Sequence, residues 1–348
     1  MLFHRRQFLA TAAAGIATGP VWAGGSKPAT AMGIALDSYA VRMRTGRRTG
    51  FTDPLRFLTF CRERGLAGVQ LPVGVRDAGY VKRLRAQLDE SGMYLEGDIR
   101  TPRDRSDQQR FEAELASASA AGATVVRTAM LGGRRYETFK TADDYRAFKR
   151  RALRSLELAE PIASRRKMRL AIENHKDYRA TELAELMRHL SSEYVGVCVD
   201  TGNNIALLDD PTETVKVLAP WAFSCHFKDM AVEDGSNGFL LAEVPLGEGF
   251  LDLNTIVQLL RRLGHAVHFN LEMITRNPLW IPCLTDGYWA TLGDVPGRDL
   301  ARTLRQVRRH APSKPLPRIM ALGLAEQLAL EDQNVQRSVT FAQQKLHL

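Results

Sequence analysis

The sequence predicts one α/β domain, a (β/α)8 TIM barrel with an extended C-terminal loop and helix. Eight short apolar runs alternate with long amphipathic segments along the chain. The beginnings of these runs recur about every 25 to 45 residues, the length of a βα unit. A barrel of eight such units typically needs about 250 residues, and the chain has 348.

Each apolar run is expected to form one strand. The runs occupy residues 32–41, 66–73, 93–99, 124–130, 168–175, 195–200, 222–227 and 267–273. The segments between them have helical spacing, and several open with proline or an acidic residue and close at glycine, as in 53–65. A doubly wound sheet is the main alternative, but no G-x-G-x-x-G loop follows the first run. We therefore expect the barrel to span residues 32–312.

Two later segments exceed what a barrel needs. Residues 275–297 form a long connection after the eighth strand, rich in aromatic and turn residues, where active-site loops and lids occur. Residues 313–348 form a C-terminal helical extension, with helical spacing over 318–346. This extension is expected to pack on the barrel, or on a second copy of the chain in a homo-oligomer.

The first 23 residues are typical of a signal peptide. They combine a basic start, a short apolar stretch and a small-residue end before Gly24. Arg5-Arg6, followed by Gln7-Phe8-Leu9, resembles the twin-arginine export signal, which carries proteins that fold before export, often with a cofactor bound. We expect residues 24–31 to be a linker, the twin-arginine export machinery to be a partner, and the mature protein to be periplasmic or secreted.

Stable membrane insertion is not expected, because the apolar stretch of the signal is short and interrupted by Gly15 and Gly19. Nucleic acid is also not an expected partner. The formal charge is +9, but the basic residues fall in helical blocks, as solvated helix faces do. The four cysteines have no C-x-x-C spacing and are interpreted as buried small hydrophobes: Cys61, Cys198, Cys225 and Cys283.

The alternation of side chains between the two faces of each predicted strand indicates which residues form a site. In the last four runs, bulky apolar residues occupy one parity and should face the helices, including Phe223, Cys225 and Phe227 in 222–227. The opposite parity should face the barrel interior near the carboxyl ends of the strands, where barrels of this kind do their chemistry. Four chemically active residues have that parity: Glu173, Asp200, His226 and Glu272.

Three carboxylates in one dry pocket repel each other unless a cation compensates them. Their oxygen-rich set with one imidazole predicts a divalent metal site, with Mn²⁺ favoured and Mg²⁺, Co²⁺ or Zn²⁺ as alternatives. Each residue also has a simpler interpretation: Asp200 can cap a helix, the glutamates can pair with Arg or Lys, and His226 can be a hydrogen-bonded core residue. The shared parity on four adjacent strands favours the metal.

Five motifs resemble the xylose isomerase-like TIM-barrel superfamily over about residues 32–310: "AIENH", "VGVCVDTGN", "CHFKDM", "PLGEGFLD" and "NLEM". The epimerase branch of that family implies that Glu173 and Glu272 act as acid and base, with Asp200 and His226 as the remaining metal ligands. The endonuclease branch needs extra histidines, and Asn203 stands in place of one. A trinuclear phosphodiester-cleaving site is therefore not expected.

The same resemblance and the strand parity indicate substrate-binding candidates: His175, Asn203, Lys228, Arg127 and Trp289. Lys228 can instead neutralise Glu272 or Glu248, and Trp289 can belong to a packed lid.

The expected function is a metal-dependent isomerase or epimerase of sugars or keto-sugars, using two glutamates to move a proton next to a carbonyl that the metal polarises. A lyase or dehydratase acting on keto-sugars or 3-keto-glycosides would use the same proton abstraction. A non-catalytic sugar-binding barrel is the alternative of a different class.

Overall fold

A computed structural model describes residues 31–46 and 50–348 of the protein. The predicted signal peptide, and all of the predicted linker except its last residue, lie outside the described residues. Within the described ranges, no helix is both long enough and apolar enough to cross a membrane.

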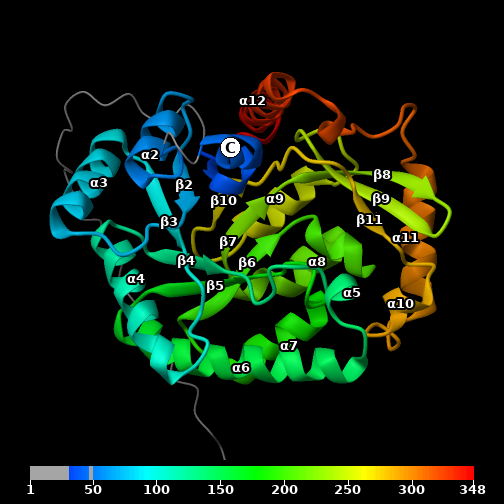
Figure 1. The fold of residues 1–348 in the computed structure, drawn as a ribbon, viewed down its shortest axis with the longest axis horizontal. Coiled ribbons are helices and arrows are strands. Elements are labelled where there is room, and N and C mark those ends of the chain that lie inside the picture. Colours follow the sequence, from blue (N-terminus) through cyan, green and yellow to red (C-terminus); the bar gives the residue numbers. More distant parts are fainter. Residues whose placement is uncertain (1–30, 47–49) are drawn as a thin grey trace, which may run out of the picture.

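Eight parallel strands close into a barrel, which confirms the predicted fold (Figure 1). Their order around the barrel is β1, β10, β7, β6, β5, β4, β3 and β2. The strands span Gly33–Ala35 (β1), Gly68–Leu71 (β2), Tyr94–Asp98 (β3), Val125–Thr128 (β4), Arg169–Glu173 (β5), Val195–Asp200 (β6), Ala222–Phe227 (β7) and His268–Leu271 (β10). Every predicted run contains one of these strands.

Helices surround the barrel and begin where the sequence supplies a cap. Asp53 accepts the backbone N–H of Arg56 at the start of α2, with proline at the first helical position. Gly92, at a φ of 66°, ends α3. The helices are Ala40–Thr45 (α1), Pro54–Arg62 (α2), Ala78–Ser91 (α3), Gln108–Ala120 (α4), Arg135–Thr138 (α5), Ala142–Arg165 (α6), Ala180–Leu190 (α7), Pro211–Leu218 (α8), Leu253–Arg261 (α9), Asp286–Trp289 (α10), Gly297–Arg309 (α11) and Leu324–Phe341 (α12).

The strands bury two separate apolar layers, as the alternation predicts. The large core cluster contains the residues expected to face the helices on the last four barrel strands: Leu170, Ile172, Val197, Val199, Cys225, Phe227, Phe269 and Leu271. A small second cluster holds residues of the opposite parity, Val125, Ala171 and Cys198. The two clusters are the outer and inner faces of one barrel wall.

The prediction for Phe223 is wrong. Its ring packs against the inner cluster rather than the helices, and it occupies the space that a side chain at Gly196 would need. The register of β6 and β7 shifts here, since Val197 pairs with Ala222 and Cys198 pairs with Ser224. This bulge gives β7 one extra residue, and a simple alternation count cannot see it.

A second sheet was not predicted. Strands Asp229–Gly235 (β8), Gly238–Val244 (β9) and Leu279–Ile281 (β11) form an antiparallel sheet in the order β11, β9, β8. β8 follows β7 almost directly, and β11 lies within the long connection of residues 275–297, which also contains α10. The glycines that flank the β8–β9 turn, Gly235 and Gly238, were the available hairpin signal.

The C-terminal helix α12 packs on the barrel, which confirms one of the two expected placements (Figure 1). Glu331 accepts the backbone N–H groups of Val41 at 2.6 Å and Arg42 at 3.1 Å, near the start of α1. Further along α12, the hydroxyl of Ser338 accepts the N–H of Leu246, and the Asn334 amide donates to Thr275. One helix therefore holds the segments that follow β1, β9 and β10.

Candidate metal centre

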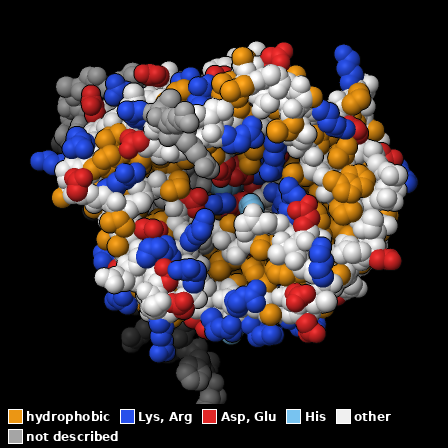
Figure 2. All heavy atoms as spheres, in the orientation of Figure 1, with side chains coloured by type: hydrophobic (Ala, Val, Ile, Leu, Met, Phe, Trp, Pro, Cys, Tyr) orange, Lys and Arg blue, Asp and Glu red, His pale blue; other side chains and the backbone are white. Residues whose placement is uncertain are grey.

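The four residues predicted as ligands come together at the carboxyl ends of the barrel strands. Glu173 ends β5, Asp200 ends β6, His226 lies in β7 and Glu272 directly follows β10. Each offers a ligand atom within 4.8 Å of the others, and all four are buried. Figure 2 shows acidic, basic and histidine side chains gathered in a hollow near the middle of the molecule.

Asp200 performs two tasks with its two oxygens. Oδ1 accepts the backbone N–H groups of Gly202 at 2.8 Å and Asn203 at 2.7 Å, so the capping interpretation holds for this atom. Oδ2 is buried and accepts no hydrogen bond among the described residues, although Nζ of Lys228 lies 2.8 Å away. Burial raises the pKa of this carboxyl, although Lys228 opposes the shift. Oδ2 is therefore available to a cation.

Glu173 is held by Arg127 and Asn203. Arg127 donates from Nε to Oε2 at 2.7 Å and also from Nη2, and its Nη1 reaches Asp98 at 3.1 Å. The Asn203 amide donates to Oε1 at 2.9 Å. Burial opposes ionisation of Glu173, but Arg127, His226 and His175 together outweigh it and hold its pKa well below the ordinary value. Both predicted substrate-binding residues thus contact a predicted ligand.

Lys228 lies between two carboxylates of the cluster. Its ammonium donates to Oε2 of Glu272 and lies beside Asp200. Burial opposes ionisation of Glu272, but Lys228, His226 and Arg127 together outweigh it and lower the pKa of that carboxyl well below its ordinary value. Glu272 and Glu248 were the two carboxylates that Lys228 was expected to neutralise. Lys228 contacts Glu272, whereas Glu248 pairs with Arg337.

His226 directs one ring nitrogen into the cluster. Nε2 is hydrogen-bonded to Oε1 of Gln70. Nδ1 lies 3.3 Å from Oε1 of Glu272 and 3.5 Å from Oε1 of Glu173, and it makes no hydrogen bond with any described residue. Burial opposes the charged ring, but Cys198 and the two glutamates hold the pKa of His226 well above its ordinary value. The surroundings of Nδ1 of His226 therefore favour a bound cation, either a proton or a metal ion.

These residues fit a divalent metal ion. The cluster is oxygen-rich, and two of its four groups, Asp200 and His226, keep a buried ligand atom without a hydrogen bond. Buried polar atoms normally have partners, so unsatisfied atoms that converge indicate a missing ligand. A carboxylate and imidazole set of this kind is compatible with Mn²⁺, Mg²⁺ and related ions, and does not by itself choose between them.

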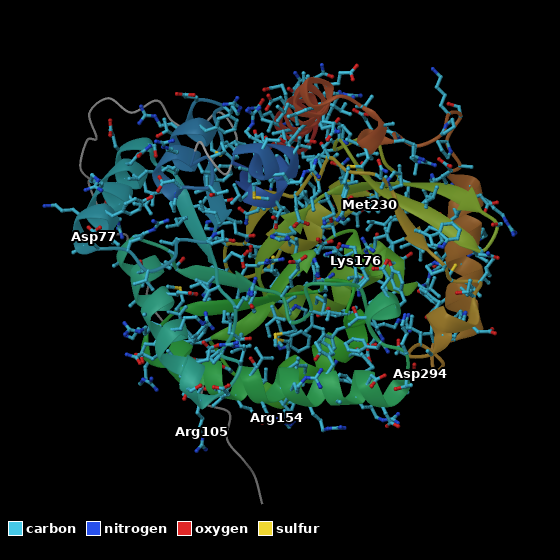
Figure 3. The ribbon with its side chains drawn as sticks, in the orientation of Figure 1. Asp77, Arg105, Arg154, Lys176, Met230 and Asp294 are labelled. Atoms are coloured by element: carbon cyan, nitrogen blue, oxygen red, sulfur yellow. The ribbon has the colours of Figure 1, made fainter. Side chains whose placement is uncertain are left out.

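The loop after β5 supplies His175 and Lys176. Nδ1 of His175 lies 2.8 Å from the Leu131 carbonyl, and burial lowers the pKa of this ring to about 4. Lys176 was not predicted. Lys176, which Figure 3 labels near the middle of the molecule, is buried and has a left-handed φ of 61°. Its ammonium donates to Oδ1 of Asn203. Burial and the nearby Lys228 lower the pKa of Lys176 to about 8.

Two further acidic residues near the cluster were missed. Burial and Glu272 raise the pKa of Asp37, just after β1, to about 6. It has the inward parity of the first apolar run, which was the available signal. Glu243 comes from β9, lies 4.0 Å from Lys228 and pairs with Arg276. No sequence pattern predicts that Glu243 lies near the cluster, because its position depends on the second sheet.

Among the described residues, no hydrogen bond or ring contact joins Trp289 to the four cluster residues. Its indole N–H donates to the Cys283 carbonyl at 2.9 Å, and its ring packs edge-on against Tyr288. The tyrosine hydroxyl in turn donates to the Ala206 carbonyl at 2.8 Å. These contacts match the packed-lid interpretation, and stacking on a substrate stays a prediction.

The aspartate that follows Lys228, Asp229, binds backbone N–H groups of the neighbouring Gly-Glu-Gly turn. Its carboxylate accepts four backbone N–H groups, from Met230, Gly247, Gly249 and Leu251, at 2.9 to 3.1 Å. Gly247 has a φ of 84°, and a Cβ on Gly249 would lie 2.1 Å from Oδ1 of Asp229. The motifs "CHFKDM" and "PLGEGFLD" are therefore two halves of one structural unit beside the site.

The closed barrel of eight parallel strands carries a buried cluster of Glu, Asp, His and Glu at the carboxyl ends of its strands. These two features identify the class of protein as a TIM barrel with a candidate metal centre. Residues 58–304 match the family model described as xylose isomerase-like TIM barrel, and the chain belongs to this family.

Solved structures of two epimerases are similar to the chain. L-ribulose 3-epimerase has a TM-score of 0.52 at 15% identity, covering 82% of this chain and 99% of that one. The 3-keto-D-glucoside 4-epimerase of E. coli has a TM-score of 0.51 at 14% identity, covering 74% and 94% respectively. At such identities the likeness shows the fold alone.

A curated relative has a different activity. The chain is 28% identical over 112 residues to 3-oxo-isoapionate decarboxylase of Pectobacterium atrosepticum, covering 32% of this chain and 41% of the relative. The chain thus matches about two fifths of that protein's length. Similar proteins therefore include epimerases and a decarboxylase.

We expect Asp229→Asn to destabilise the protein by roughly 2 to 4 kcal/mol, because the amide can accept at only one of the two positions and hydrogen bonds to charged groups contribute roughly 1.5 to 3 kcal/mol each. Urea unfolding measures the loss. Asp234→Asn, at an exposed position of β8, is the matched control. Equal stability of the two variants would contradict the anchoring role.

Proposed function

We propose that the protein is a metal-dependent isomerase or epimerase of sugars or keto-sugars. The observation that carries this proposal is the convergence of Glu173, Asp200, His226 and Glu272, whose ligand atoms lie within 4.8 Å of one another in a buried pocket. Membership of the xylose isomerase-like family and the epimerases among similar folds support it.

Glu173 and Glu272 are the proposed acid and base. In the barrel order, β6 and β7 separate β5 from β10, so the two carboxylates approach a substrate from different sides. One can remove a proton from carbon and the other can return one to the opposite face. A divalent ion in the cluster would polarise a substrate carbonyl and so acidify the neighbouring C–H group. Arg127 and Lys228 favour the ionised form of both glutamates, which suits the one that removes the proton, and the one that returns a proton must first take it up from solvent.

The remaining polar residues of the pocket are proposed to bind substrate hydroxyl groups. His175 and Asn203 lie beside the cluster and carry side chains that can donate or accept hydrogen bonds. Lys228 and Arg127 already bind carboxylates of the cluster. Their proposed role is to stabilise negative charge that develops on the substrate oxygen during proton removal.

Deuterium exchange tests the acid and base roles. We expect the Mn²⁺-loaded protein to incorporate solvent deuterium into a reactive ketose or 3-keto-glycoside, and Glu272→Gln to lose about 10² to 10⁴ of that rate, the range of general acid–base contributions. Mass spectrometry measures uptake, and Mn²⁺ binding by each variant is measured in parallel.

Asp234→Asn serves as the control for this exchange. Uptake unaffected by Glu272→Gln would refute the proposed role. Sugar binding without uptake for any substrate by the wild-type protein would instead indicate a non-catalytic sugar-binding barrel.

The position of Lys176 favours a second candidate, a lyase acting on keto acids. Its buried ammonium is held by the amide oxygen of Asn203, and no carboxylate among the described residues forms an ion pair with it. A substrate carboxylate would supply the missing anion. The similarity to a decarboxylase is consistent with this reaction class, since loss of CO₂ from a β-keto acid leaves the same enolate that proton abstraction forms.

Lys176→Met separates the two candidates. If keto acids are the substrates, we expect the wild-type protein to release CO₂ from 3-keto sugar acids. The variant should lose at least about tenfold more activity on these acids than on neutral ketoses, because a charge-assisted hydrogen bond contributes roughly 1.5 to 3 kcal/mol. Absence of CO₂ release from every acid tested would exclude the lyase candidate and leave the epimerase proposal untouched.

We also propose that residues 1–23 direct export of the folded protein to the periplasm. The twin-arginine pattern at Arg5 and Arg6 supports this. Replacing both arginines with lysine should retain the protein in the cytoplasmic fraction, whereas His4→Gln should not, as judged by immunoblotting of fractions. Unchanged periplasmic yield in the lysine variant would contradict twin-arginine export.

A further inference from the structure

Buried polar side chains occupy the barrel interior next to the metal cluster. Gln70 comes from β2, Glu96 from β3, Ser224 from β7 and Asn270 from β10, and all four are at most 3% exposed. Barrels of this type usually fill this space with Val, Ile and Leu. Burying a carboxylate here is costly unless hydrogen bonds compensate it, so the group needs an explanation.

Glu96 organises this polar group. Oε2 accepts the amide N–H of Gln70 at 2.9 Å, the hydroxyl of Ser224 at 2.6 Å and the amide N–H of Asn270 at 2.9 Å. Oε1 lies 2.9 Å from Nδ1 of His268. Gln70 thus faces Glu96 with its NH₂ group, beside the Ser224 and Asn270 donors, and its carbonyl oxygen faces the other way.

That carbonyl oxygen contacts His226. Oε1 of Gln70 is the partner of Nε2, and a carbonyl oxygen accepts but cannot donate. Nε2 of His226 must therefore carry a proton. The lone pair left for a metal ion is then on Nδ1, the nitrogen that lies 3.3 and 3.5 Å from the two glutamates.

We propose that Gln70 and Glu96 are positioning residues for the metal centre. Glu96 fixes the orientation of the Gln70 amide, and Gln70 fixes the tautomer and ring orientation of His226, so that Nδ1 is the ligand atom. Partners of this kind, which hold the second nitrogen of a ligating histidine, typically contribute 10- to 100-fold to metal affinity. This inference rests on the proposed metal centre but concerns residues to which neither the sequence nor the family comparison assigned a role.

The first test reads the tautomer without any substitution in this polar group. In ¹⁵N-histidine-labelled protein loaded with Zn²⁺, which is diamagnetic, the His226 resonances should show a protonated Nε2 and an unprotonated Nδ1. The His226→Gln variant identifies these resonances by their loss. A protonated Nδ1 with an unprotonated Nε2 in the wild-type protein would overturn the proposal.

The second test measures Mn²⁺ affinity by electron paramagnetic resonance of the free ion. Gln70→Met keeps the side-chain length but removes the acceptor, and should weaken Mn²⁺ binding by about 10- to 100-fold. Glu96→Gln keeps the shape but lets the Gln70 amide flip, and should also weaken binding and give a mixture of His226 tautomers. Thr128→Val, at a buried position whose hydroxyl has no partner among the described residues, is the control for buried polar substitution.

The outcomes distinguish this inference from the proposed function. Unchanged Mn²⁺ affinity and an unchanged tautomer in a folded Gln70→Met or Glu96→Gln protein would contradict the positioning role alone. Absence of Mn²⁺ binding by the wild-type protein would contradict the metal-dependent function itself. If both variants fail to fold, the wild-type tautomer decides the question.

Discussion

The constraint on which the rest of the structure depends is the burial of three carboxylates at one end of the barrel. The protein holds one oxygen of Asp200 by backbone N–H groups and one oxygen of Glu272 by Lys228. It holds both oxygens of Glu173, one by Arg127 and one by Asn203. Oε1 of Glu173 and Oε1 of Glu272 lie beside Nδ1 of His226, and Asp200 offers a ligand atom within 4.8 Å of the other three residues. A dry pocket with this charge distribution is stable only when cations compensate it. Arg127 and Lys228 supply part of this compensation, and the proposed divalent ion would supply the rest.

Hydrogen bonds tie the surrounding elements to this end of the barrel. Asp229 joins the end of β7 to the Gly-Glu-Gly turn through four backbone hydrogen bonds. Helix α12 joins the segments after β1, β9 and β10. The hairpin of β8 and β9 brings Glu243 to within 4.0 Å of Lys228. Long additions to the barrel therefore support the geometry of the site, as precise chemistry requires of its supporting residues.

The number and spacing of the apolar runs were sufficient to predict the barrel. Strand alternation was sufficient to predict the four converging residues, because a two-residue period fixes the face of every side chain in a regular strand. The alternation failed at Phe223, where a bulge adds one residue to β7. Lys176 and Glu243 were missed because a loop with a left-handed residue and an unpredicted hairpin place them. The contacts of Lys228 with Asp200 and Glu272 depend on side-chain reach across strands, which no local pattern encodes.

The most direct test of the central claim is equilibrium dialysis of the purified protein against Mn²⁺, compared with a variant carrying both Asp200→Asn and His226→Gln. We predict about one Mn²⁺ per chain for the wild-type protein and loss of that site in the variant, because a preorganised set of deprotonated ligands is what binds a metal ion tightly. A wild-type protein that binds no divalent ion, or a variant that binds it equally well, would contradict the assignment of this cluster as a metal centre.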